Sequence, residues 1–222
     1  MEMKISPSSP SRPTSADLRR TAALIALMLA AAGLALYQAT MGLRVVSTEE
    51  GRRLAIAEAP LALPRTTLAQ PGAGHPVTLQ ALLAADGRPA IVTFFYARCN
   101  AVCSAQGSEL QQIQRDILAR GLKQKVRLLS ISFDARDTPA DLALYAERMR
   151  ADPEIWQFAA VPDAAQLQSL LEQIGITVLP AELGEFQHNA AFHLVSASGK
   201  LQQVVDYEQP DAALRAALGP NQ

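Results

Sequence analysis

One stretch limits what this 222-residue chain can fold into more than any other. Residues 21–43 carry no charge, and Thr21, Gln38 and Thr40 are the only side chains there more polar than Tyr37. As a helix this stretch would be about 35 Å long, enough to cross the hydrocarbon core of a bilayer. A signal peptide has a shorter apolar core and a buried helix usually carries a polar stripe, so both alternatives fit less well. We therefore expect an uncleaved transmembrane anchor at residues 21–43.

The charges beside this stretch indicate its orientation. Basic residues are slightly more numerous before it than soon after it: Lys4, Arg12, Arg19 and Arg20 against Arg44, Arg52 and Arg53. An excess of positive charge favours the cytoplasmic side of a membrane. We expect residues 1–20 to be a cytoplasmic tail and the rest to lie outside the cytoplasm. Because the tail lacks an Arg/Ser-rich transit segment, the predicted location is a bacterial inner membrane, crossed once, with the soluble domain in the periplasm.

The rest of the chain has the composition of one soluble domain. The whole sequence is 49% hydrophobic, which is ample for a packed core, and its net charge is only −1. No dense block of Lys and Arg is present, so nucleic-acid binding is not expected. We expect residues 44–75 to be a tether and residues 76–222 to be the folded domain.

Apolar patterning predicts alternating strands and helices in this domain. Residues 90–97 and 126–133 are apolar runs typical of strands buried on both faces, and the helical spacing after the first run stops at Gly121. Further elements are predicted as helices at about 139–150 and 163–174, a hairpin at 190–196 and 201–206, and a helix at 210–218. This order predicts a thioredoxin-like α/β fold with a central mixed sheet flanked by helices, in which the first strand–helix–strand unit is parallel.

The only two cysteines, Cys99 and Cys103, directly follow the first predicted strand, where a helix begins. Residues four apart lie on one face of a helix, so both sulfur atoms can point the same way. The positive end of the helix favours the thiolate, which is both the metal ligand and the nucleophile. The alternatives are two small buried side chains or one structural disulfide.

His188 is the candidate third metal ligand among the three histidines. It precedes the predicted hairpin strand and so falls at the same end of the sheet as the cysteines. His193 lies inside that strand, where a packed or surface role is expected, and His75 lies in the tether, where none is expected. Two thiolates and one imidazole make a soft site that suits copper. Softness alone does not exclude zinc, although structural zinc sites usually take four protein ligands.

The segment FFYARCNAVC at residues 94–103 resembles the signature of the Sco (SenC) family of copper chaperones. Further matching segments follow in the same order: Ser130–Asp134, Arg136–Pro139, Tyr145, Trp156 with Phe158, His188, and Ser198–Gly199. The resemblance covers about residues 60–207 and includes the anchor. It implies a membrane-anchored, thioredoxin-like protein that binds copper through Cys99, Cys103 and His188. The implied partner is the CuA-bearing subunit of cytochrome c oxidase, during its assembly, or another copper-protein client.

The chain departs from this family pattern around the implied ligands. The family usually has proline where Asn100 and Ser104 stand, and often has aspartate where Gln187 stands. The acidic segment is one residue shorter, with only Ala135 between Asp134 and Arg136. These changes bear on metal affinity, redox potential and partner choice more than on the fold.

A second function would use the same cysteines as a catalytic pair. A membrane-anchored thiol–disulfide oxidoreductase could cycle Cys99 and Cys103 between dithiol and disulfide and so reduce the cysteines of a client. A metallochaperone is not an enzyme, whereas this alternative is one. Against it, the pair has one residue more than the usual CxxC spacing and lacks the Trp-Cys-Gly-Pro context. A peroxidase is a weaker alternative, because Tyr96 stands where a peroxiredoxin has threonine.

Three other residues have a structural and a functional interpretation. Arg136 and Asp137 are predicted to form a helix entry with Thr138 and Pro139, the alternative being a charged rim for docking. Trp156 is predicted to be packed in the core rather than to contact a partner.

Overall fold

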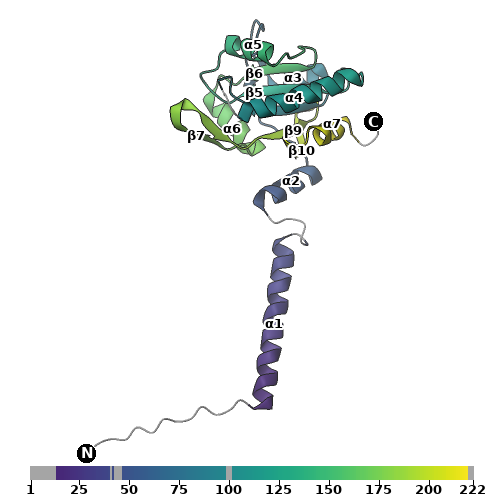
Figure 1. The fold of residues 1–222 in the computed structure, drawn as a ribbon, viewed down its shortest axis with the longest axis vertical. Coiled ribbons are helices and arrows are strands. Elements are labelled where there is room, and N and C mark those ends of the chain that lie inside the picture. Colours follow the sequence, from purple (N-terminus) through teal and green to yellow (C-terminus); the bar gives the residue numbers. More distant parts are fainter. Residues whose placement is uncertain (1–13, 41, 43–46, 99–101, 220–222) are drawn as a thin grey trace, which may run out of the picture. The chain divides into compact units, whose positions relative to one another are not determined.

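The structure is a computed structural model, in which residues 14–40, 42, 47–98 and 102–219 are described (Figure 1). The side chains of residues 17, 102–105 and 183 are not among the described features. The chain forms two compact units, residues 1–52 and 53–222.

The first unit contains helix α1 (Ser15–Ala39) (Figure 1). Its segment Leu18–Ala39 is long and apolar enough to cross a membrane, with a mean hydropathy of 1.9 and none of it buried. Among the described residues this is the one helix with that property. The helix confirms the expected apolar N-terminal element, although the last residues of the predicted anchor, including Met41 and Leu43, lie outside the described part. A second helix, α2 (Thr48–Glu58), follows.

The second unit is built on a six-stranded mixed sheet with the order β1-β10-β9-β4-β5-β6. Its strands are β1 (Leu61–Ala62), β4 (Ala90–Phe95), β5 (Arg127–Ser132), β6 (Trp156–Ala160), β9 (Ala191–Val195) and β10 (Lys200–Asp206). Strands β4, β5 and β6 are parallel, and β9 is antiparallel to both β4 and β10. The predicted parallel strand–helix–strand unit and the predicted hairpin are therefore confirmed.

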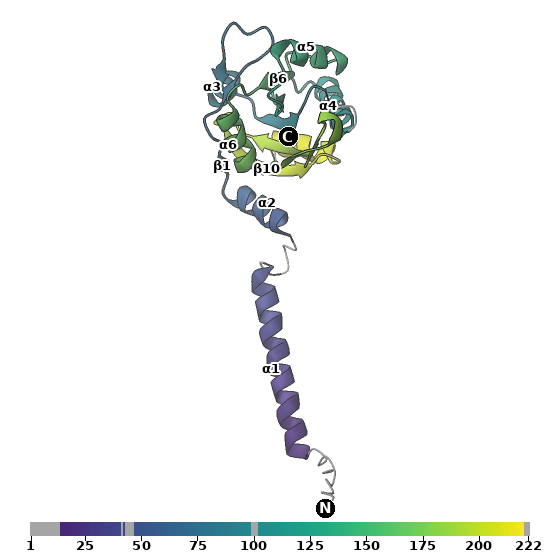
Figure 2. The ribbon, with the colours of Figure 1, turned by 90° about the vertical axis from the view of Figure 1, so that its left-hand side faces the viewer.

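Helices cover both faces of this sheet. They are α3 (Leu79–Asp86), α4 (Val102–Ala119), α5 (Pro139–Arg148), α6 (Ala164–Ile174) and α7 (Pro210–Leu218). Figure 2 shows α3 and α6 on one side of the sheet and α4 on the other, where α7 packs against it. Two small sheets complete the unit: β2 (Thr67–Leu68) with β3 (Val77–Thr78), and β7 (Val178–Pro180) with β8 (Phe186–His188). A short 3₁₀ turn, η1 (Glu182–Gly184), joins β7 to β8.

Local signals in the sequence form the predicted helix ends. The Asp163 side chain accepts a hydrogen bond from the Gln166 amide at 2.8 Å, and Gly175 ends α6 with a left-handed φ of 82°. Thr138 and Asp141 form a reciprocal capping box at the start of α5, with Pro139 as its first residue. These contacts confirm the predicted starts of α5 and α6.

The region predicted as a tether differs from that prediction. Residues from Arg53 onward belong to the compact domain: Ile56, Leu63 and Leu68 are buried, and β1 adds to the sheet edge beside β10. Arg53 also forms an ion pair with Asp206 at 2.7 Å. A two-residue strand carries no periodicity, so only its pairing with a distant strand reveals it.

Strand β6 was also missed by the sequence patterns. It begins at Trp156, which is 1% exposed and donates a hydrogen bond from Nε1 to the Ser130 hydroxyl at 2.9 Å. This contact confirms the packed interpretation of Trp156.

Candidate metal-binding site

The cysteines lie on residues 98–103, called the cysteine segment below, which follow β4 and include the first two residues of α4. Cys99 is outside the described residues, and Cys103 is the second residue of α4, described only by its backbone. Strand β4 ends at Phe95, so this segment starts at the carboxyl end of the parallel strands β4 and β5. The distances between the predicted ligands therefore stay outside what the structure describes.

His188 lies at this same end of the sheet. Its ring contacts the ring of Phe133, which directly follows β5, with the ring centroids 4.9 Å apart. Phe133 in turn contacts Tyr96, which directly follows β4, at 5.4 Å. A chain of ring contacts thus leads from His188 to the start of the cysteine segment. As predicted, His188 stands just ahead of a strand, β9, but it is also the last residue of β8 in the β7–β8 hairpin, which the sequence did not indicate.

Asn189 holds the base of the β7–β8 hairpin. Its Oδ1 accepts a hydrogen bond from the Thr177 amide at 2.7 Å, and its Nδ2 donates to the Gly175 carbonyl at 2.8 Å. The Nδ1 atom of His188 lies 3.2 Å from the Asn189 carbonyl oxygen. The half-buried imidazole is therefore oriented by the same residue that ties the hairpin to the end of α6.

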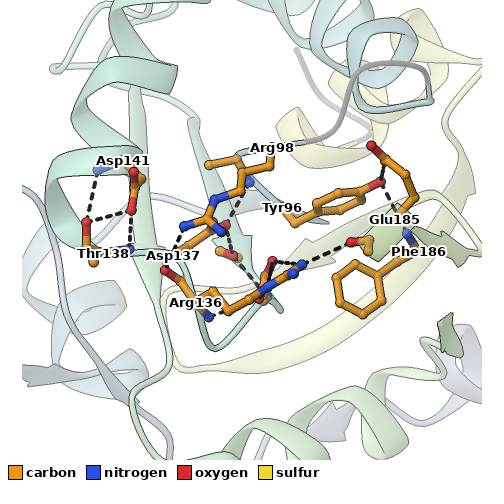
Figure 3. Close-up of polar contacts among 12 residues, drawn as sticks. Tyr96, Arg98, Arg136, Asp137, Thr138, Asp141, Glu185 and Phe186 are labelled. Atoms are coloured by element: carbon orange, nitrogen blue, oxygen red, sulfur yellow. Dashed lines mark hydrogen bonds and ion pairs between the residues drawn. The ribbon is translucent and has the colours of Figure 1, made fainter. Parts of the chain in front are cut away.

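Asp137 holds the backbone that leads into the cysteine segment. Its Oδ2 accepts hydrogen bonds from the Ala97 amide at 2.7 Å and from the Ser132 hydroxyl at 2.6 Å (Figure 3). The Ala97 carbonyl accepts a hydrogen bond from Arg148 at 2.9 Å. Both polar backbone groups of Ala97, two residues before Cys99, are thus occupied. Reading Asp137 as part of a helix entry missed this role, because no local pattern links it to Ala97.

Asp134 and Arg136 form an ion pair beside the hairpin. Arg136 donates to Asp134 from Nε at 2.8 Å and from Nη2 at 2.7 Å, and Nη2 also donates to the Gly184 carbonyl at 3.0 Å. Burial acts to raise the pKa of Asp134, but hydrogen bonds from the Arg136 side chain and backbone, and its positive charge, outweigh burial. The pKa of Asp134 therefore lies below its usual value of 3.8. This half-exposed arginine joins the loop after β5 to the tip of the hairpin.

This lowered pKa predicts a loss of stability in acid. The ionised Asp134 contributes stability that is fully present above its unfolded-state pKa of about 3.8 and is lost as pH falls through the lower folded-state pKa. We therefore expect the free energy of unfolding, measured by urea denaturation, to fall between pH 5 and about pH 2. Asp134→Asn should be less stable than the wild type at pH 6 and lose less stability over this range. Equal pH dependence of the two proteins would contradict the assignment.

The other two histidines lie elsewhere in the domain. His193 is buried in β9 with its ring edge-on to Phe94 at 5.6 Å, so of the two roles expected for it, packed or surface, it has the packed one. His75 is exposed in the loop before β3. Within the described part of the chain, no group of three His, Cys, Asp or Glu side chains could hold a metal ion.

Comparisons with known proteins agree with this architecture. The sequence profile of the SCO1/SenC family matches residues 72–219, which is well over half of the chain. No curated protein sequence matches this chain. Solved structures do match, and each comparison below is at under 25% sequence identity and so bears on the fold.

Three of these structures are representative. A SCO1/SenC family lipoprotein from Bacillus anthracis is 19% identical, with a TM-score of 0.58 over 72% of this chain and 98% of that one. BsSco, described as a member of the Sco family of cytochrome c oxidase assembly proteins, is 20% identical, with a TM-score of 0.58 over 72% and 95%. ScoI of Bradyrhizobium japonicum, solved with copper bound, is 24% identical, with a TM-score of 0.55 over 70% and 97%.

The profile match spans the whole strand–helix–strand unit that carries the cysteines, the hairpin that carries His188, and the C-terminal helix α7. The TM-scores of 0.55 to 0.58 indicate that this domain and these structures share a fold. The chain belongs to the SCO1/SenC family.

Proposed function

We propose that this protein is a membrane-anchored copper chaperone. In this proposal Cys99, Cys103 and His188 bind copper(I) and release it to a copper-protein client, the CuA-bearing subunit of cytochrome c oxidase. The observation that carries it is the chain of ring contacts from His188 through Phe133 to Tyr96, three residues before Cys99. That chain supports a site at this end of the sheet, in which the imidazole of His188 would join the two thiolates.

The ligand chemistry supports copper(I) as the cargo. Thiolate and imidazole ligands suit soft metal ions, and copper(I) accepts a sulfur-rich site with few ligands. When the Nδ1–H of His188 donates to the Asn189 carbonyl, Nε2 carries the lone pair that binds the metal. Family membership adds to this argument, because ScoI of Bradyrhizobium japonicum binds copper.

The apolar helix α1 supports membrane anchoring. Its segment Leu18–Ala39 is long enough to span a bilayer, and the basic residues before it favour a cytoplasmic N-terminus. In a bacterium this orientation places the domain in the periplasm at the inner membrane. Anchoring a chaperone in the plane of a membrane-bound client raises the effective concentration of one for the other. Membrane anchoring therefore favours a client that is itself a membrane protein.

The proposal is tested by anaerobic copper(I) titration of the reduced full-length protein against a competing chelator. We expect one tight equivalent, and a loss of about 10- to 100-fold in affinity on His188→Ala, because one of three ligands is removed. His75→Ala is the matched control, since it removes an exposed histidine outside the site and should leave the affinity unchanged.

The alternative function predicts a different result. If the reduced wild type binds no copper(I) but its dithiol still reduces a client disulfide, the chaperone proposal fails and a thiol–disulfide oxidoreductase is favoured. His188→Ala should then leave the rate of disulfide reduction unchanged. Binding that is equally tight in the wild type and in His188→Ala would remove the histidine from the site.

A further inference from the structure

We propose that Tyr96 and Glu185 are positioning residues that hold His188 in place for metal binding. This inference rests on the proposed function and deepens it. The Tyr96 hydroxyl donates a hydrogen bond to Glu185 Oε2 and accepts one from the Phe186 amide at 3.4 Å (Figure 3). One side chain at the end of β4 thus contacts two successive residues of the segment that leads to His188.

Burial of Tyr96 strengthens its hydrogen bond to Glu185. Tyr96 is 2% exposed and Glu185 is half-buried, so the hydrogen bond between them is partly shielded from water and is stronger than the same bond on the surface. Breaking it would deprive a buried hydroxyl of its charged partner, and this cost favours the arrangement in which the hairpin stays against the end of β4. The bond therefore ties the end of β4 to the hairpin.

The aromatic rings pass this constraint on to His188. Phe186 and His188 are two residues apart on β8, so their side chains lie on the same face of that strand. Phe186 packs against Tyr96 at 5.2 Å and against Phe133 at 5.6 Å, and Phe133 also contacts His188 at 4.9 Å. If β8 moved away from Tyr96, the ring contacts of Phe186 and of His188 would be lost at the same time.

Arg136 supplies a second tie at the same tip. It donates to the Gly184 carbonyl, its guanidinium lies 5.4 Å from the Phe186 ring centroid, and its charge attracts Glu185. The first contact starts from Tyr96, next to the cysteine segment, and the second from Arg136, in the loop after β5 (Figure 3). Both end on residues 184–186.

The hairpin needs these ties because it is small. Strands β7 and β8 have three residues each and, within the described part of the chain, pair only with one another. An isolated two-stranded hairpin is marginally stable in water. Asn189 secures its base, whereas Tyr96 and Arg136 secure its tip. Without the Tyr96–Glu185 bond, metal binding would have to order the hairpin, and that ordering would weaken affinity.

The test compares Tyr96→Phe and Glu185→Ala with the wild type by copper(I) competition. Tyr96→Phe keeps the ring and removes only the hydroxyl, and we expect an affinity about 3- to 10-fold weaker. Tyr207→Phe is the matched control, because it removes a hydroxyl that lies after β10 and should have no effect. In copper-free protein, the amides of residues 185–188 should exchange hydrogen faster in Tyr96→Phe than in the wild type.

A second background separates positioning from general destabilisation. If Tyr96 acts through His188, adding Tyr96→Phe to His188→Ala should not weaken copper binding further. An equal loss in both backgrounds, or no loss in the wild-type background, would overturn the inference. If the wild type binds no copper, the proposed function fails, and hydrogen exchange alone decides the positioning role. Unchanged exchange at residues 185–188 would then overturn it.

Discussion

Replacing both cysteines by serine is expected to abolish tight copper(I) binding. A hydroxyl is a hard, protonated group at neutral pH, whereas a thiolate is soft and ionised, so Cys99→Ser/Cys103→Ser removes the two ligands that select copper(I). Taking about 3 kcal/mol for each ligand, from the binding free energies of sites with several ligands, the expected loss is about 10⁴-fold. Competition with a chelator of known affinity measures this loss directly.

The controls for this experiment concern folding and ligand choice. Serine is close to cysteine in size, so thermal unfolding of the double variant should match that of the reduced wild type. His188→Ala, which keeps both thiolates, should retain much more affinity than the double variant. If the double variant binds copper(I) as tightly as the wild type, the metal site lies elsewhere and the chaperone proposal is wrong.

Asp86→Ala is expected to have the largest effect on stability. Arg127 is 1% exposed at the start of β5, and its Nη1 lies 3.1 Å from Asp86 Oδ2. Its Nε has no hydrogen-bond partner among the described residues, although Nη2 donates to Gln157. Removing Asp86 would leave a buried guanidinium without its counter-charge. Such a change typically lowers the free energy of unfolding by about 3–5 kcal/mol.

Arg88 is a second arginine that depends on the Asp86 carboxylate. It donates to the same Asp86 carboxylate from Nε at 2.6 Å and from Nη2 at 2.7 Å. Urea denaturation should show the full loss for Asp86→Ala but a smaller one for Asp86→Leu/Arg127→Met, since the second variant removes the buried guanidinium of Arg127 and leaves only Arg88 without its carboxylate partner. A loss below about 1 kcal/mol for Asp86→Ala would show that water or other groups compensate Arg127.

The fold was largely predictable from local patterns. Continuous apolar runs indicated β4 and β5, because a strand covered on both faces must be apolar at every position. Asp163 and Gly175 marked the ends of α6, since capping and left-handed φ values depend on residues next to one another in the chain. The missed strands, β1, β2, β3, β6, β7 and β8, have at most five residues each. Helices α2 and α3 were missed as well, because both precede the first strong apolar run, at β4.

The site was predictable only in part. The cysteine spacing and the position of His188 were visible in the sequence, and the structure describes His188 at the end of the sheet where the cysteine segment starts. The roles of Asp137 and Tyr96 were not visible. Asp137 accepts a hydrogen bond from Ala97, 40 residues away, and Tyr96 donates one to Glu185, 89 residues away.

The sequence by itself therefore determined the apolar N-terminal helix, the alternation of strands and helices, and the residue types available for binding a metal. These features follow from hydrophobic patterning and backbone preferences, which act between near neighbours. Only the tertiary structure decided which side chains hold the cysteine segment and the His188 hairpin. Hydrogen bonds and ring contacts between distant segments depend on how the sheet aligns strand ends, and no local pattern encodes that alignment.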